Sequence, residues 1–518
     1  MKKRIVNRET VIAFIIVCLG IFIRMVAFGS VPDGLNQDEA FAGYEAFSLL
    51  HYGVDSAGYH NPCYFVSWGS GMNVLESYLA IPFVKILGLS VISVRLPQLL
   101  LACCSLPVFY LLLKEILDHK AALIGLFLLS ISPWHIMLSR WGLESNLAPA
   151  FLLFGLYFFV KGIRENFYFI LSAFLFGISL YAYSIMWLVV PLTLAGMCTY
   201  LLVRKIKVSF SYALTAVLIL FCLALPLMLF LLVNQGVIPE IKTNFFSVPK
   251  LVSMRDSEIS LSNLFSLSSY KNFLQVTVFQ SDGLPWNSVE HYGLYYLLAL
   301  PFVILGIVCF SKNAWRKFRK KEFSYEILLF IGALCSGFVC LLIAGLNVNK
   351  ANSLHFYILI FETVGLREAY RLCKEKNIFS LYQTLIASYL LSFVCFSVFY
   401  FGDYNDRISS DFNAGLEQAI PFAKTLESEE ILVDSSIFYS QVLFFDQTPT
   451  PEYLNTVEYT NYPSAFLKVS RFGKYNFSLN YDQLEQDKIY LIPKENSDIF
   501  ETDGFSIEEF KNYVVAYR

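Results

Sequence analysis

Two adjacent carboxylates, Asp38 and Glu39, lie in the polar segment that follows the first long apolar stretch of the sequence. A carboxylate pair can accept a proton from a reacting hydroxyl group, or it can bind a divalent metal ion. The same pair is also typical of a helix start, where acidic side chains complement the helix dipole. The sequence leaves both interpretations open.

A second polar segment, Ser139–Asn146, is short and lies between two apolar stretches. Its Arg140 could hold a phosphate group, and its Glu144 could bind a metal ion or a sugar hydroxyl. The alternative interpretation is an Arg-Trp anchor at the membrane interface, made by Arg140 and Trp141.

Three further cations lie at the edges of apolar stretches or inside them. Arg95 begins the second stretch, Arg24 lies within the first, and Lys350 is the single cation of the polar run Asn347–Asn352. An ionisable residue in a membrane span is costly and indicates a function. The alternative for the arginines is that their side chains extend to the lipid headgroups.

Histidines do not add a metal site to this set. Five of the six gather near the predicted outer boundary, at positions 51, 60, 135, 291 and 355. No pair of them has the spacing of metal ligands. We therefore assign no metal ligand and no cofactor, and leave open a divalent metal bound by acidic residues.

The composition places these residues in a membrane protein. Hydrophobic residues make up 56% of the chain and charged residues 15%, against about 45–50% and about 25% in soluble domains. A soluble core could not bury so much apolar surface, because cores stop growing with chain length. The net charge of -2 also argues against a nucleic-acid partner, which would require a basic surface.

Hydropathy predicts about eleven membrane spans of about 20 residues each. The first, from Val11 to Phe28, exceeds the apolar region of a signal peptide, so we interpret it as an uncleaved span. The apolar segment Met72–Leu89 contains Pro82 and Gly88 and is predicted to lie along the outer interface instead. The predicted spans begin at Val11, Val94, Ala121, Leu147, Phe167, Trp187, Ser209, Tyr292, Tyr325, Leu354 and Phe379.

Basic residues set the predicted orientation. With the N-terminus on the cytoplasmic side, every second loop carries a basic cluster, and the N-terminus carries another. The positive-inside rule makes this side cytoplasmic. The clusters are Lys2–Arg4, Lys114 with Lys120, Lys161 with Arg164, Arg204–Lys207, Arg316–Lys321 and Arg367–Lys376.

The fold class predicted from this pattern is an all-α polytopic membrane bundle with a small C-terminal extracytoplasmic α/β domain. We expect residues 1–401 to form the membrane domain and residues 402–518 the C-terminal domain, which carries strand-like runs and an amphipathic helix. External loops are expected at about residues 29–93 and 234–291. All candidate site residues then fall near the outer interface.

The order of these motifs resembles the GT-C glycosyltransferases, in particular the protein mannosyltransferase and aminoarabinose-transferase-like group. The resemblance rests on the acidic pair after the first span, the interfacial segment before Ser93–Pro97, the short second loop, and a long loop that ends in Asp282–Asn287 and Tyr292–Tyr295. It covers about residues 1–400. The C-terminal region resembles the variable domains of bacterial members.

This resemblance implies an enzyme of the bacterial plasma membrane whose active site and C-terminus are extracytoplasmic. Such enzymes transfer a sugar from a polyprenyl-phosphate donor to a cell-envelope glycan, lipid or protein, usually with inversion. Asp38 matches the family's catalytic Asp and Glu39 its partner, and Arg95 and Arg140 match cations near the lipid phosphate. Lys350 stands where many bacterial relatives have Arg, which keeps the charge but removes a two-pronged phosphate contact.

Two other functions remain alternatives. A carrier or flippase for lipid-linked sugars would place its site near the membrane midplane, often between repeated halves. A polysaccharide polymerase would use the same type of donor, but with loop arginines in place of an acidic pair.

Overall fold

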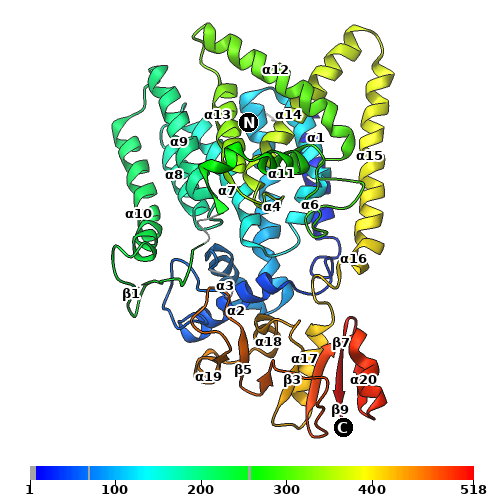
Figure 1. The fold of residues 1–518 in the computed structure, drawn as a ribbon. Helices are drawn as coiled ribbons and strands as arrows, with labels where there is room; N and C mark the ends of the chain where they lie inside the picture. Colours follow the sequence, from blue (N-terminus) through cyan, green and yellow to red (C-terminus); the bar gives the residue numbers. More distant parts are fainter. Residues whose placement is uncertain (1–7, 68–70, 255–257) are drawn as a thin grey trace, which may run out of the picture.

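The structure is a computed structural model that describes residues 8–67, 71–254 and 258–518. The N-terminal basic cluster, Lys2–Arg4, lies outside the described residues. The chain forms a mostly helical bundle, and a smaller sheet-containing region adjoins one end of it (Figure 1). This agrees with the predicted fold class.

A helix occurs at each of the eleven predicted positions. Seven of the described helices are long and apolar enough to cross a membrane, and His119–Ile131 and Tyr168–Ser179 are shorter apolar helices. The number of spans therefore remains a prediction. The eleven helices are α1 (Arg8–Met25), α4 (Val91–Ile116), α5 (His119–Ile131), α7 (Glu144–Gly162), α8 (Tyr168–Ser179), α9 (Met186–Val203), α10 (Phe210–Asn234), α12 (Leu300–Arg319), α13 (Tyr325–Leu342), α14 (Asn352–Glu375) and α15 (Phe379–Phe401).

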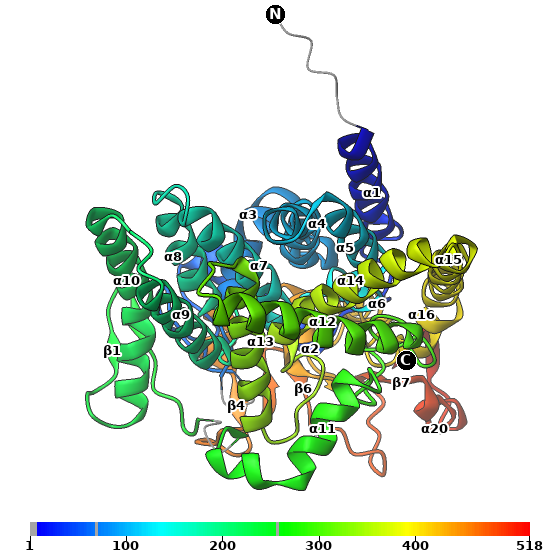
Figure 2. The same ribbon diagram turned by 90° about the horizontal axis from the view of Figure 1, so that it is seen from above.

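Burial separates the central helices from the peripheral ones. In α7, 78% of the apolar window is buried, against 17% in both α10 and α15. Figure 2 shows α10 and α15 at opposite edges of the bundle. Their outward side chains include Phe210 and Val398, which are 80% and 73% exposed. Large apolar side chains in such numbers on an outer surface fit a lipid environment.

Glycines bring α12 and α14 into backbone contact. A Cβ atom added at Gly306 would lie 1.7 Å from the carbonyl oxygen of Phe361, and one at Gly365 would lie 1.9 Å from that of Phe302. Small residues at such crossings allow helices in membranes to approach closely. This contact fixes α14, whose N-terminal end follows the polar run that contains Lys350.

One predicted helix begins later than the sequence pattern indicated. The apolar stretch from Tyr292 becomes α12 only at Leu300, after a 3₁₀ turn at Leu297–Ala299. Tyr296 has a φ of 67°, which interrupts a right-handed helix. The side chain of Gln280 also accepts the backbone N–H groups of Leu294 and Tyr295, at 3.1 and 2.8 Å, in place of helical bonds.

The first outer loop contains two helices, α2 (Gln37–Tyr52) and α3 (Leu75–Leu87), which pack against each other and against α4. Helix α3 corresponds to the interfacial segment predicted at Met72–Leu89. Figure 1 shows α2 and α3 between the bundle and the C-terminal sheet. Two further helices in loops are α6 (Pro133–Leu138) and α11 (Leu267–Thr277).

The C-terminal region is an α/β domain, as predicted. Its central strand β3 (Ile431–Val433) pairs in parallel with β6 (Tyr475–Asn476) and β7 (Ile489–Pro493). The sheet order is β4-β5-β6-β3-β7-β9-β8. The outer strands are β4 (Glu458–Tyr459), β5 (Val469–Phe472), β8 (Ser506–Glu509) and β9 (Tyr513–Tyr517), and the helices are α16 (Asp403–Ile408), α17 (Leu416–Thr425), α18 (Tyr439–Asp446), α19 (Thr450–Thr456) and α20 (Ser497–Thr502).

Helix α18 and the residues after it connect this domain to α2 through packing and hydrogen bonds. The amide of Gln441 donates to the carbonyl oxygen of Leu35 at 2.9 Å, and the Tyr44 hydroxyl donates to that of Thr448 at 2.8 Å. A Cβ atom at Gly43 would lie 2.5 Å from the Phe444 ring, so α2 and α18 are tightly packed. The C-terminal domain is therefore held against the helix that begins beside Asp38.

Candidate active site

The acidic pair lies in the first turn of α2, where its two residues have different partners. Asn36 caps the helix, because its side chain accepts the Asp38 N–H at 3.0 Å. Glu39 completes the capping box by accepting the Asn36 N–H at 3.1 Å. The helix-start interpretation is therefore realised by Asn36 and Glu39.

Glu39 is fully buried and joins three parts of the fold. Its carboxylate forms a two-pronged ion pair with Arg95, with N–O distances of 2.8 and 2.9 Å. It also accepts the backbone N–H of Gly142 at 2.6 Å. Both oxygens are thus engaged within the protein. This arrangement suits a positioning residue better than the predicted catalytic partner of Asp38.

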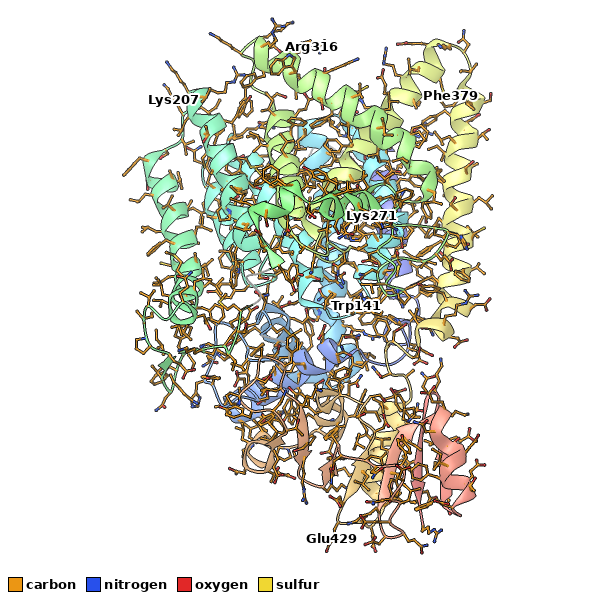
Figure 3. All side chains as sticks on the ribbon, in the orientation of Figure 1. Trp141, Lys207, Lys271, Arg316, Phe379 and Glu429 are labelled. Carbon is orange, nitrogen blue, oxygen red and sulfur yellow. The ribbon has the colours of Figure 1, made fainter. Side chains whose placement is uncertain are left out.

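Asp38 instead lines a cavity of about 300 Å³, here called the outer cavity. Five separate parts of the chain meet in it: the start of α2, the second outer loop, the loop before α12, the loop before α14, and the C-terminal region. Trp141, labelled in Figure 3, marks its level between the bundle and the sheet. Its lining residues are Asn36, Gln37, Asp38, Trp141, Leu143, Trp286, Asn349, Ser410, Asp411, Asn413 and Phe438.

Asp411 is a second carboxylate of the outer cavity, and the sequence analysis did not single it out. Burial raises the pKa of Asp411 above its usual value. Its carbonyl oxygen accepts from the amide of Asn36 at 3.4 Å, which ties the linker after α16 to the cap of α2. In the sequence, Asp411 follows Asp403 and Asp406 in one polar run, and only the folded chain distinguishes it from them.

Arg95 and Arg140 hold the backbone between α1 and α2. Arg95 donates to the carbonyl oxygens of Pro32 and Gly34, both at 2.8 Å, in addition to its ion pair with Glu39. Arg140 donates to four carbonyl oxygens at the end of α1 and beyond it, those of Arg24, Val26, Ala27 and Val31, at 2.7–2.9 Å.

Neither guanidinium lines the outer cavity. Arg24 is likewise internal, because it donates to the carbonyl oxygens of Gly20, Leu129 and Ser130. The hydrogen bonds of Arg95 and Arg140 therefore give no support to the predicted contacts with a donor phosphate, and they indicate a positioning role.

Glu144 and Lys350 line a second cavity of about 420 Å³, here called the mixed cavity. Lys350 forms an ion pair with Glu258 at 2.9 Å, and Glu144 accepts from the backbone and side-chain nitrogens of Asn73 at 2.5 and 2.9 Å. The rest of its wall is largely aromatic and aliphatic, and includes Tyr64, Trp187, Leu188, Phe230, Leu231 and Leu251. A charged end and an apolar wall make this cavity amphipathic.

The two cavities lie on either side of the same two loops. In the second outer loop, Leu143 lines the outer cavity and its neighbour Glu144 lines the mixed cavity. In the loop before α14, Asn349 lines the outer cavity and Lys350 the mixed one. We call these two pairs of residues the partition.

Glu76 and Gln98 form hydrogen bonds that hold Leu143 of the partition in position. The Gln98 amide donates to Glu76 at 2.6 Å and to the carbonyl oxygen of Leu143 at 3.0 Å. Burial raises the pKa of Glu76 well above its usual value, and the nearby charges of Glu39 and Glu144 raise it further. The sequence analysis missed Glu76, because it lies in an apolar segment that showed no motif.

Among residues 8–67, 71–254 and 258–518, no group of three or more His, Cys, Asp and Glu side chains could hold a metal ion. His135 and His355 are buried and bind within the bundle: His135 contacts Arg24, and His355 contacts Tyr295 and the carbonyl oxygen of Val348.

Comparison with known proteins identifies the fold. Residues 74–230 match the family model described as dolichyl-phosphate-mannose-protein mannosyltransferase. Comparison with curated proteins finds no significant match.

The fold is shared with solved structures over nearly the whole chain. ArnT from Cupriavidus metallidurans in the apo state has a TM-score of 0.58 at 12% identity, over 98% of each chain. Its complex with undecaprenyl phosphate has a TM-score of 0.56 at 12% identity, over 97% of each chain. The apo oligosaccharyltransferase of Archaeoglobus fulgidus has a TM-score of 0.51 at 12% identity, over 86% of this chain and 64% of that one. The chain therefore has a GT-C fold of the protein mannosyltransferase and ArnT-like type, as the order of its motifs predicted.

Proposed function

We propose that this protein is a glycosyltransferase that moves a sugar from a polyprenyl-phosphate donor to an extracytoplasmic acceptor. The observation that carries the proposal is the pair of cavities on either side of one partition, one amphipathic and one lined by Asp38. The ArnT structure with bound undecaprenyl phosphate supports a donor of this class, because that protein shares the fold.

The mixed cavity is the proposed donor site. An isoprenoid tail requires an apolar wall, and Trp187, Leu188, Phe230 and Leu231 provide one. The donor phosphate requires a cation, and among the described residues that line this cavity Lys350 is the cation. On donor binding, Lys350 would exchange its ion pair with Glu258 for one with the phosphate. Glu144, on the same wall, would accept hydrogen bonds from sugar hydroxyls.

The outer cavity is the proposed acceptor site, and Asp38 is the proposed general base. Asp38 takes the proton of the acceptor hydroxyl, whose oxygen attacks the anomeric carbon from the face opposite the phosphate. The bond from that carbon to the phosphate oxygen breaks, and its electron pair leaves with the polyprenyl phosphate, so the configuration inverts. Positive charge develops on the sugar and negative charge on the phosphate, and Lys350 stabilises the latter.

The remaining candidates position these groups. Arg95 and Arg140 hold the segment that leads into α2, and Glu39 links that helix start to Gly142 beside the partition. Asp411 and Phe438 line the outer cavity, so the C-terminal region borders the proposed acceptor site. We propose that this region selects the acceptor, which is a cell-envelope glycan, lipid or protein.

The proposed location is the bacterial plasma membrane, with the outer cavity and the C-terminal domain outside the cytoplasm. The basic clusters support this orientation, because Lys207 and Arg316 lie at one end of the bundle and Glu429 lies beyond the other (Figure 3). The positive-inside rule makes the basic end cytoplasmic.

A panel of donors tests the proposal. The purified full chain is placed in liposomes that contain one polyprenyl-phosphate sugar at a time, together with an envelope extract as acceptor. We expect one donor to be cleaved, with polyprenyl phosphate and a glycosylated product released in equal amounts. A panel without any cleavage would contradict the proposal, and movement of an intact donor across the membrane would favour the carrier alternative.

A further inference from the structure

A third cavity, of about 930 Å³, lies at the end of the bundle that is remote from the candidate active site. It is bounded by the start of α5, the later parts of α12 and α14, and the start of α15, and we call it the basic-end cavity. Figure 3 places Arg316 and Phe379, near the ends of the helices that border it, opposite Glu429 of the C-terminal domain. It shares no lining residue with the outer or mixed cavity.

Two of its four cations are already neutralised. Arg367 forms an ion pair with Asp118 at the start of α5. Arg371 binds Glu368 and Glu375 on its own helix, and the distance to Glu375 is 2.6 Å. These pairs account for three of the four carboxylates that line the basic-end cavity.

The other two cations are lysines without a carboxylate partner. The fourth carboxylate, Glu326, is paired at 2.9 Å with Lys317, which does not line the cavity. Lys120 lies 5.6 Å from the centre of the Tyr370 ring, and Lys374 has no ion pair within the described part of the chain. Of the four cations that line this cavity, Lys120 and Lys374 are therefore the two without an ion pair among the described residues, and with Lys317 counted the positive charges exceed the carboxylates by one.

The deeper wall of the basic-end cavity is apolar. It is formed by Leu123 and Ile124 of α5, Phe310 of α12 and Val364 of α14. Helices α12 and α15, on its outer side, have only 22% and 17% of their apolar windows buried, so they face the bilayer in a membrane. The cavity thus combines two lysines that have no carboxylate partner with an apolar wall.

We propose that the basic-end cavity binds the phosphate headgroup of an anionic membrane lipid, with Lys120 and Lys374 as its cations. The chains of that lipid lie along Leu123, Ile124 and Phe310. Basic pockets between helices on the cytoplasmic side of a membrane suit this class of ligand. The site is separate from the proposed donor site and does not depend on the proposed reaction.

Lipid retention measured by native mass spectrometry tests this site. The full chain in detergent is mixed with equal amounts of phosphatidylglycerol and phosphatidylcholine, and the ratio of retained lipids is recorded. A lysine near a charged lipid surface contributes about fivefold in affinity, so the preference for phosphatidylglycerol should fall at least tenfold in Lys120→Gln/Lys374→Gln. Equal retention of both lipids by the unaltered chain would overturn the proposal.

Two matched variants control for folding and for total charge. Lys120→Arg/Lys374→Arg keeps both charges and should keep the preference. Arg319→Gln/Lys320→Gln removes two exposed charges from the neighbouring loop and should leave the preference unchanged. The proposal also fails if this loop variant loses as much preference as the lysine variant. A competition with polyprenyl phosphate then identifies the source of the headgroup: displacement of phosphatidylglycerol assigns the site to a prenyl phosphate, and retention assigns it to a glycerophospholipid.

Discussion

Asp38 and Glu39 are adjacent in sequence, yet their side chains have different environments. Successive residues of a helix point about 100° apart, so α2 turns Glu39 into the core and Asp38 toward the outer cavity. The sequence offered a helix cap and a catalytic carboxylate as competing interpretations. In the structure the cap is provided by Asn36 and Glu39, and a base at Asp38 is compatible with it.

Replacement of Asp38 by Asn tests the proposed base. Asn has nearly the same size and caps helices about as well as Asp, but it cannot accept the proton. General-base catalysis contributes about 10²–10⁴-fold, so kcat should fall at least about a hundredfold while donor binding persists. Asp406→Asn is the matched control, because that acid is 77% exposed and pairs with Lys511. Near-normal transfer by Asp38→Asn would contradict the assignment of Asp38 as the base.

Lys350 is expected to act on the donor. A charge-assisted contact contributes about 1.5–3 kcal/mol, so Lys350→Gln should lower kcat/KM for the donor by about ten- to a hundredfold, with the acceptor KM unchanged. Lys350→Arg should retain most of the activity. Lys271→Gln on α11 removes an exposed charge that lines neither the outer nor the mixed cavity, and it serves as the control. If the acceptor KM rises and the donor KM does not, Lys350 belongs to the acceptor site.

At the scale of elements, the sequence predicted the positions of the helices well. It predicted the contacts of their polar residues less well. Arg95 and Arg140 were recognised as functional cations from their place at the outer boundary. In the structure their partners are Glu39 and carbonyl oxygens from Arg24, at the end of α1, to Gly34, and the sequence pattern does not define the path of the chain between α1 and α2. The same limit applies to Asp411, because it reaches the outer cavity through long-range contacts such as the hydrogen bond from the Asn36 amide to its carbonyl oxygen.

Arg95→Met distinguishes a positioning role from a phosphate contact. The change leaves Glu39 buried without its partner, which typically costs about 3–5 kcal/mol, so Tm should fall and kcat should fall with it. The donor KM should change little, because Arg95 does not line the mixed cavity. Adding Glu39→Gln removes the unpaired charge and should restore part of the stability. A rise in donor KM with an unchanged Tm would instead support direct contact with the phosphate.

The loop after α2 should make stability depend on pH. Burial raises the pKa of Asp55 from 3.8 to about 7, and burial with the nearby Asp55 charge raises that of Glu45. Between about pH 4 and about pH 7, the folded state therefore binds more protons than the unfolded state. The free energy of unfolding falls as the pH rises through this range. Lys242 lies near enough to oppose part of this shift.

Thermal unfolding in detergent at pH 5.5 and pH 8.0 measures this dependence. We expect a lower Tm at pH 8.0, and a smaller difference in Asp55→Asn, which keeps the oxygen that accepts the Ala57 and Tyr59 N–H groups at 3.0 and 2.7 Å. An equal pH dependence in both proteins would show that Asp55 does not titrate in this range.

For the whole molecule, the patterns of hydropathy and charge were sufficient to predict the class of fold. Each predicted apolar stretch became a helix, and the runs at Ile431 and Ile489 became neighbouring strands of one sheet. The packing of the C-terminal domain against α2 could not be predicted from the sequence. It depends on contacts between distant residues, such as Gly43 with Phe444 and Gln441 with Leu35. These contacts bring the C-terminal domain to the outer cavity, whereas every candidate site residue predicted from the sequence lies within residues 1–401.

The orientation of the whole molecule is the last prediction, and it decides on which side of the membrane transfer takes place. Basic residues lie at the end opposite the C-terminal domain, so the positive-inside rule predicts that domain outside the cytoplasm. Glu429→Cys and Lys207→Cys introduce one exposed thiol at each end (Figure 3). A membrane-impermeant maleimide should label Glu429→Cys in intact cells and Lys207→Cys only after lysis, above the background of the 11 native cysteines in the unaltered chain. The reverse pattern would place Asp38 in the cytoplasm, where its substrates would have to be cytoplasmic as well.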